Sequence, residues 1–177
     1  GRGASPQLQK AAEILQRVRP DVLLINEVDF DPAERRNLQL FEERYLAVSQ
    51  RGQPPLRYAH SFFAPVNTGV PSGRDLDNDG ASDGPGDGFG FGRYPGQYGI
   101  GLLSRYAIDE EHARTFQELL WNQVPGHLIP DGQQGRPDWY APEEVQILRL
   151  SSKSHWDVPI TIHGHTIHLL ASHPTPP

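Results

Sequence analysis

The sequence contains neither cysteine nor methionine, and its basic residues are outnumbered by its acidic ones. Without cysteine, neither a disulfide framework nor a thiolate metal site can form. No apolar run approaches the ~20 residues that a membrane-spanning helix needs, and no signal peptide is visible. The net charge of −6 argues against a protein that holds nucleic acid mainly through a basic face. A phosphate ligand would therefore need a metal ion or a local cluster of Lys and Arg.

Glycine and proline are abundant instead, with 18 and 17 copies, so long irregular segments are expected. The clearest of these is a loop at about residues 65–97 that is rich in Gly, Asp and Pro. A loop of this length in a compact domain is usually functional or disordered. The 177 residues can form one domain with a sizeable core. Because no Met marks an initiator, we expect residues 1–177 to be a single partial domain of a longer polypeptide.

Helices and strands are predicted in an order typical of a layered α/β (α+β) domain. Ser5 as N-cap, Pro6 at the first helical position and the apolar spacing that follows predict a helix that Pro20 ends. Residues 31–34 resemble a capping box and predict a second helix. Strands are predicted at residues 21–25, 58–64, 98–104, 145–150, 158–163 and 166–172. Short strands in series favour antiparallel or mixed sheets.

The dipeptide Asn26-Glu27 is the most informative feature of the chain. It follows the apolar strand at residues 21–25, so one carboxylate stands at the C-terminal tip of a buried strand. In open α/β sheets this tip is where ligands and metals bind. A single Glu after a strand is more often an N-cap or loop residue than a functional carboxylate. A functional role for Glu27 therefore needs support from other segments.

Three segments together supply that support. They are Pro20-Asp21-Val22-Leu23-Leu24-Ile25-Asn26-Glu27, Tyr98-Gly99-Ile100-Gly101-Leu102-Leu103-Ser104-Arg105 and His168-Leu169-Leu170-Ala171-Ser172-His173. In their order and intervals they resemble the endonuclease/exonuclease/phosphatase superfamily, which includes DNase I-like nucleases, apurinic-site nucleases and inositol polyphosphate phosphatases. Each segment alone is a weak signal, and the resemblance rests on the three together.

The resemblance implies a four-layer α/β sandwich of DNase I-like type and divalent-metal phosphoesterase chemistry. Glu27 matches the family glutamate that binds Mg²⁺ or Mn²⁺, and an oxygen ligand suits such a hard cation. His173 matches the histidine that contacts the scissile phosphate. Asn26 stands where many members have Gln, and either amide can orient the neighbouring carboxylate. The implied substrate is a phosphoester, either a nucleic acid or a small-molecule or lipid phosphate.

Two family motifs are absent from the chain. Members carry Gly-Asp-x-Asn and then Ser-Asp-His, which holds the general base, and neither follows His173. An Asn-bearing first strand is also expected before Gly1. We therefore expect the whole protein to be a phosphoric ester hydrolase and residues 1–177 alone to be inactive.

An acidic segment with D-x-D-x-D-G spacing lies in the long loop. Asp75, Asp77 and Asp79 surround a glycine turn as in calcium loops, and Asp83 follows. The bidentate Glu of an EF-hand is missing, because Gly86 stands there, and a solvated acidic loop is an equal alternative. A Ca²⁺ site would favour an extracytoplasmic or secreted location. It also defines the alternative function, a secreted calcium-ordered binding module that kept the fold without catalysis.

Three polar residues near the penultimate strand are secondary substrate-binding candidates. Lys153, His155 and Asp157 alternate along this strand and could present a charged row on one face. Ordinary cross-strand pairs explain them about as well. On the last strand, alternation puts His168 and His173 on opposite faces, so a zinc site built from the neighbouring histidines is not expected.

Overall fold

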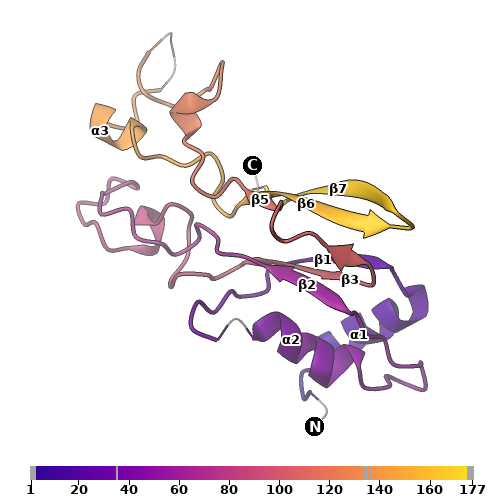
Figure 1. The fold of residues 1–177 in the computed structure, drawn as a ribbon. Coiled ribbons are helices and arrows are strands. Elements are labelled where there is room, and N and C mark those ends of the chain that lie inside the picture. Colours follow the sequence, from indigo (N-terminus) through magenta and orange to yellow (C-terminus); the bar gives the residue numbers. More distant parts are fainter. Residues whose placement is uncertain (1–2, 35, 134, 136, 175–177) are drawn as a thin grey trace.

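The computed structural model describes residues 3–34, 36–133, 135 and 137–174. Its first layer is helical (Figure 1). The helix α1 (Pro6–Val18) begins at Ser5, whose side chain accepts a hydrogen bond from the Leu8 amide at 3.4 Å, as the sequence predicts. The helix α2 (Asn37–Phe41) continues into a π-helical turn, η1 (Glu42–Leu46). None of the described helices is long and apolar enough to cross a membrane.

Two antiparallel sheets follow the helical layer. The first has the order β1-β3-β2, with β1 (Val22–Asn26) and β2 (His60–Phe63) on either side of β3 (Ile100–Ser104). The second is built on β6 (His155–Ile162), which pairs with β7 (His165–Ser172) along its whole length. Two short strands, β4 (Ala107–Ile108) and β5 (Arg114–Thr115), also pair with β6. His163 and Gly164 make the β6–β7 turn with φ values of 50° and 80°.

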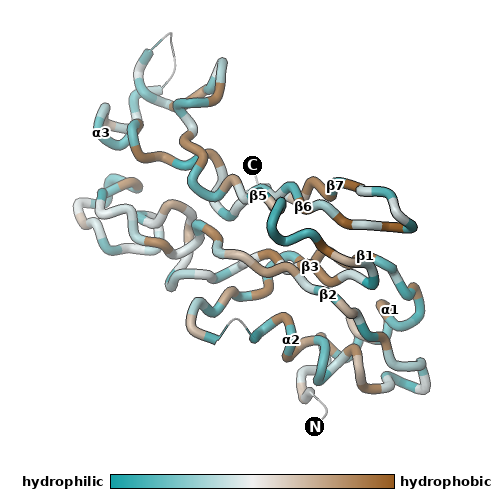
Figure 2. The backbone as a smooth tube through the Cα atoms, viewed as in Figure 1, coloured by the Kyte–Doolittle hydropathy of each residue, from teal (hydrophilic) through white to brown (hydrophobic). Residues whose placement is uncertain are grey.

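The core lies at the two interfaces between these layers. The helices pack on one face of the first sheet through a buried cluster: Ala12, Leu38, Leu46, Leu56, Tyr58 and Leu103. The other face of this sheet packs on the second sheet through another cluster: Ala64, Val66, Ile100, Leu102, Trp156, Val158, Ile160 and Ala171. Phe62 and Trp156 meet edge to face across that interface, with ring centroids 5.0 Å apart. Figure 2 shows hydrophobic segments along the strands of both sheets.

The long loop is ordered by pairing within itself rather than by regular strands. Thr68 bridges to Gly90 and Pro71 to Gly88, on either side of the acidic segment and the short helix η2 (Pro85–Asp87). A third, smaller cluster joins this loop to the region around η3 (Trp121–Gln123) and α3 (Pro142–Val145). Its buried members are Leu76, Ile129, Val145 and Leu148.

The predicted α/β fold of DNase I-like type with antiparallel sheets is confirmed, and the described residues form three layers of it, one helical layer and two sheets. Two local predictions are wrong. The second helix does not start at the predicted capping box: the Asp31 side chain accepts the Ala33 amide in a turn, and the helix begins at Asn37. Residues 145–150 are not a strand, because Pro142 starts a helical turn and only Arg149 bridges to another segment. Both errors come from short local signals that the tertiary packing overrides.

Candidate functional site

Glu27 stands directly after β1 and has a strained backbone. Its φ is 63°, in the left-handed region that a Glu seldom adopts. The following residues hold it there, because the Val28 amide donates to Gly99 O at 3.2 Å and the Phe30 amide to Gly96 O at 2.7 Å. The conformation leaves 65% of the Glu27 side chain exposed. Strain of this kind gathers at functional sites, where the surrounding structure enforces it.

His173 comes from the other sheet and meets Glu27. It follows β7, and its side chain is only 16% exposed. Its Nε2 lies 3.8 Å from Glu27 Oε1, which joins the ends of the first and second sheets. The packing of the two sheets therefore brings together the two residues that the sequence predicts for metal and phosphate binding.

The surroundings of His173 favour its neutral form. Burial lowers the pKa of His173, the Lys153 charge lowers it further, and the Glu27 carboxylate opposes both. Because burial and Lys153 outweigh Glu27, the imidazole is neutral near pH 7, and the 3.8 Å contact is not a full ion pair. Nδ1 is enclosed and has no hydrogen-bond partner among the residues that the structure describes. A neutral imidazole keeps one donor and one acceptor nitrogen, so it can donate to a phosphoryl oxygen.

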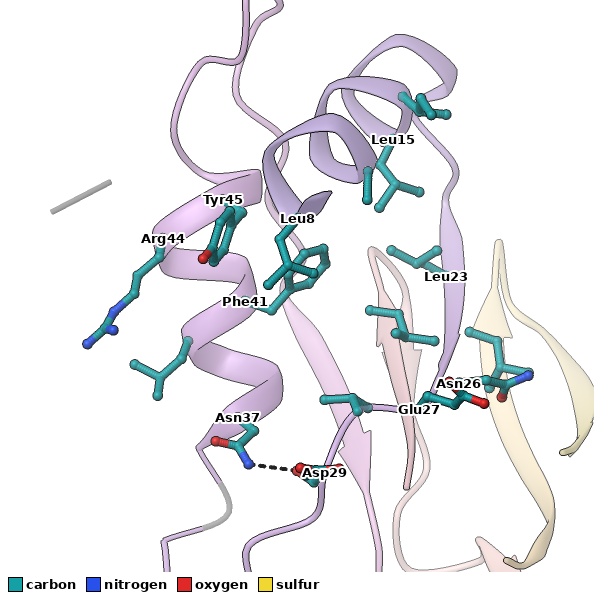
Figure 3. Close-up of a pocket in the computed structure, with 16 residues that line it drawn as sticks. Leu8, Leu15, Leu23, Asn26, Glu27, Asp29, Asn37, Phe41, Arg44 and Tyr45 are labelled. Carbon is teal, nitrogen blue, oxygen red and sulfur yellow. Dashed lines mark hydrogen bonds between the residues drawn. The ribbon is translucent and has the colours of Figure 1, made fainter. Parts of the chain in front are cut away.

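Asn26 and Glu27 also line one end of a cleft of about 800 Å³ (Figure 3). The walls are mostly apolar and come from α1, β1 and α2. Figure 3 shows Leu8, Leu15 and Phe41 among them, with Glu27 near the end of β1. The cleft lies on the helical side of the first sheet, and His173 is not among its lining residues.

Asp29 is a structural residue of the site that the sequence analysis did not single out. Its carboxylate accepts hydrogen bonds from the Tyr94 hydroxyl at 2.6 Å and the Tyr98 amide at 3.0 Å. Its carbonyl accepts one from Asn37 Nδ2 at 2.8 Å, drawn in Figure 3. The segment after Glu27 is thereby tied to both the long loop and α2. No spacing in the sequence links Asp29 to partners 65 and 69 residues away.

The three secondary candidates separate in the structure. Asp157 is buried on β6, and both its oxygens are engaged, one by Arg114 Nη2 at 2.5 Å and one by His168 Nδ1 at 2.7 Å. These partners lower the pKa of Asp157, Arg114 first and His168 second. His155 opens β6 and pairs with Ser172. Lys153 is the one that lies close enough to His173 to affect its pKa.

A buried polar hub supports the segment that contains Lys153. Asn67 is fully buried, and its Nδ2 donates to the carbonyls of Gln117 and Ser151, each at 2.7 Å. Its Oδ1 accepts from Arg149 Nη1 at 2.5 Å. The Arg149 guanidinium also lies 4.1 Å from the centre of the Phe89 ring, a cation–π contact. This hub joins the long loop to the segment that precedes β6, the strand paired with β7, which His173 follows.

In the acidic loop, three carboxylates come within metal-binding distance of one another. Those of Asp75, Asp77 and Asp87 offer oxygens that all lie within 4.8 Å. Asp87 is buried and accepts the amides of Leu76 and Gly84. Asp79 and Asp83 are exposed and outside this group. Lost hydration and then the neighbouring carboxylates raise the pKa of Asp77, so a cation would relieve their repulsion.

Comparison with known proteins identifies the family. A sequence profile of the Endonuclease/Exonuclease/phosphatase family matches residues 1–176. The chain therefore belongs to this family, whose members hydrolyse phosphoester bonds and typically depend on a divalent metal. Searches of curated proteins and of solved structures found no match. The family resemblance of the three sequence segments is confirmed.

Proposed function

We propose that the protein is a divalent-metal-dependent phosphoesterase whose site is centred on Glu27 and His173. The observation that supports this most is the distance of 3.8 Å between Glu27 Oε1 and His173 Nε2, two residues that come from different sheets. The surrounding structure holds the Glu27 backbone in the left-handed region. Family membership sets the reaction class, phosphoester hydrolysis. The substrate is a phosphodiester or a phosphomonoester. The net charge of −6 favours a small-molecule or lipid phosphate at least as much as duplex DNA.

The residues fit a hard cation. Glu27 offers an exposed carboxylate, and Mg²⁺ commonly binds through one or two carboxylates plus water and substrate phosphate. When bound, Mg²⁺ or Mn²⁺ would neutralise charge on the phosphoryl oxygens. His173, neutral and partly enclosed, would donate a hydrogen bond to one of those oxygens. Asn26 beside Glu27 would orient its carboxylate.

The test is hydrolysis of a chromogenic phosphodiester and phosphomonoester by the full-length protein, with Mg²⁺, with Mn²⁺ and with a chelator. We expect metal-dependent activity that Glu27→Gln and His173→Asn each lower by about 10²-fold or more. Residues 1–177 alone should be inactive, since they lack the Ser-Asp-His general base. Chelator-resistant activity, or full activity in Glu27→Gln, would contradict the proposal.

A calcium-ordered binding module is the second candidate, and the cluster of Asp75, Asp77 and Asp87 supports it. Ca²⁺ at this cluster would order the long loop, and its use would favour an extracytoplasmic location. We expect Ca²⁺ to raise the thermal midpoint of the wild type and to have a smaller effect on Asp77→Asn. Without Ca²⁺, Asp77→Asn should be slightly the more stable, because it removes repulsion between carboxylates. Stabilisation by Ca²⁺ with no hydrolysis in any metal would select the module over the enzyme.

A further inference from the structure

Lys153 is a buried cation without a carboxylate partner. The chain has two lysines, and Lys10 is exposed while Lys153 is only 8% exposed. Among the residues that the structure describes, no Asp or Glu forms an ion pair with Lys153. Lysines are almost never buried unless they are paired, because removing an ammonium from water is costly. The stem of Lys153 is therefore covered, and no described carboxylate neutralises its charge, which leaves the ammonium open to an anionic ligand.

The backbone of Lys153 is held from both sides. Its amide donates to Ser151 Oγ at 3.2 Å, and its carbonyl accepts the Asn67 amide at 2.9 Å. The neighbouring Ser152 carbonyl packs so closely on Gly90 that a Cβ there would lie 2.0 Å from its oxygen. The backbone at Lys153 is thus held in place by the segment that contains the buried Asn67.

Lys153 is also at the same end of the second sheet as His173. The strand β6 begins two residues after Lys153, and its first residue, His155, pairs with Ser172, the neighbour of His173. The Lys153 stem is covered, since the residue is largely buried. Its ammonium makes no hydrogen bond to a described residue and yet is not enclosed, so the tip of the side chain reaches the surface. Its charge contributes to the lowered pKa of His173, in agreement with this placement.

We propose that Lys153 is a substrate-binding residue whose ammonium binds the non-bridging phosphoryl oxygens of the phosphoester bound at the Glu27–His173 site. This role rests on the proposed function of the site. It explains how a protein with a net charge of −6 presents a local positive charge to phosphate. A lysine suits the task as a compact point charge that does not require a planar, bidentate partner.

The experiment measures binding of inorganic phosphate by calorimetry in the presence of Mg²⁺. Three variants of the full-length protein are compared: Lys153→Met, Lys153→Arg and, as a control with the same loss of charge, Lys10→Met. We expect Lys153→Met to weaken phosphate binding about 10- to 100-fold, the usual effect of losing a charged hydrogen bond. Lys153→Arg should retain part of the affinity, and Lys10→Met should match the wild type. Equal phosphate affinity in the two Met variants would overturn the proposal.

Two further readouts separate the possible failures. The thermal midpoint of Lys153→Met should not fall, because Met fills the space of the covered stem and no ion pair with a described carboxylate is lost. Lys153→Gln replaces this variant if it does not fold. In the phosphodiester assay, Lys153→Met should raise KM. Unchanged kinetics in an active protein would refute the Lys153 role and leave the proposed function standing. Lysine-dependent phosphate binding without hydrolysis in Mg²⁺ or Mn²⁺ would support the phosphate site and refute the enzyme.

Discussion

Glu27 adopts an unfavourable backbone conformation, and its carboxylate is exposed. Among the described residues, no strong interaction of this side chain offsets the cost of that conformation. The left-handed conformation at φ 63° costs an L-residue of this size about 1 kcal/mol or more. Within the described residues, no Lys or Arg forms an ion pair with this side chain, and its approach to a neutral His173 is weak. The conformation at Glu27 therefore lowers the stability of the fold, as expected at a ligand-binding position.

Replacing Glu27 by Asn should separate stability from function. Asn tolerates the left-handed region well, so Glu27→Asn should raise the free energy of unfolding by about 1 kcal/mol while the proposed metal ligand is lost. Urea unfolding measures the first effect and phosphoester hydrolysis the second. Glu27→Gln is the matched control, because it removes the charge and keeps the strain. A less stable Asn variant would show that the conformation is not strained.

Tyr58 predicts an alkaline limit to stability. Burial, the largest cause, raises its pKa to about 12, and its hydroxyl donates to Pro20 O at 2.9 Å. The folded protein holds this proton more tightly than the unfolded chain, so the stability it contributes is present below pH 10 and is lost between pH 10 and 12. We expect a loss of about 2 to 3 kcal/mol across this window. Tyr58→Phe, followed by urea unfolding at several pH values, should lack that part of the loss.

At the scale of elements, the long loop acts as a support for β6 rather than as a free connection. Its two ends pair with each other, and Gly90 lies directly on the Ser152 carbonyl. Gly92 and Gly69 pack in the same way, with a Cβ on Gly92 only 2.7 Å from the Gly69 nitrogen. Glycines at these positions let two backbones approach where side chains would not fit.

Gly90→Ala should therefore destabilise the protein and disturb the Lys153 segment. The added methyl group has no room beside the Ser152 carbonyl, and we expect a loss of about 2 kcal/mol. Gly80→Ala is the comparison: its φ of 91° is unfavourable for Ala, but nothing lies within 4 Å, so the cost should be about 1 kcal/mol. Chemical denaturation measures both. Phosphate binding should weaken only in Gly90→Ala, and equal effects of the two variants would argue against the support role.

What the sequence predicts well are features with local causes. The first helix, the strand before Glu27 and the β6–β7 hairpin all appear, because Ser5, Pro6, Pro20 and Gly164 act within a few residues. The apolar spacing of this helix does not by itself define its buried face: Val18 is 68% exposed, while Gln16 is buried and its Nε2 donates to Leu46 O.

The supports of the site are what the sequence does not predict. The Asn67 hub depends on Gln117, Arg149 and Ser151, which are 50 to 84 residues away. The Asp75, Asp77 and Asp87 group likewise depends on η2 folding the loop back on itself. The pairing of Glu27 with His173 was accessible only through the family resemblance, since no local pattern connects two different sheets.

For the whole molecule, the decisive interface is that between the two sheets. Trp156 is fully buried at its centre and meets Phe62 edge to face. Its indole Nε1 has no hydrogen-bond partner, so this side chain contributes through packing alone. The same interface sets how closely the ends of β1 and β7 approach.

Trp156→Ala should cost about 3 to 5 kcal/mol of unfolding free energy, because the cavity lies between layers that cannot easily collapse. Trp156→Phe keeps much of the volume and removes the unpaired N–H, so its cost should be clearly smaller. Guanidinium unfolding measures both. Comparable losses in the two variants would indicate that the indole nitrogen, and not the volume of the ring, matters at this position.

Since Glu27 follows a strand of one sheet and His173 a strand of the other, the geometry of the proposed site depends on how the two sheets are aligned. A slide of a fraction of an ångström would leave both sheets fully hydrogen-bonded and yet misplace the 3.8 Å pair. Heating should accordingly abolish turnover several degrees before the molecule melts. Adaptation to a colder or warmer habitat would then proceed through substitutions at the contact between Phe62 and Trp156, while Glu27 and His173 stay unchanged.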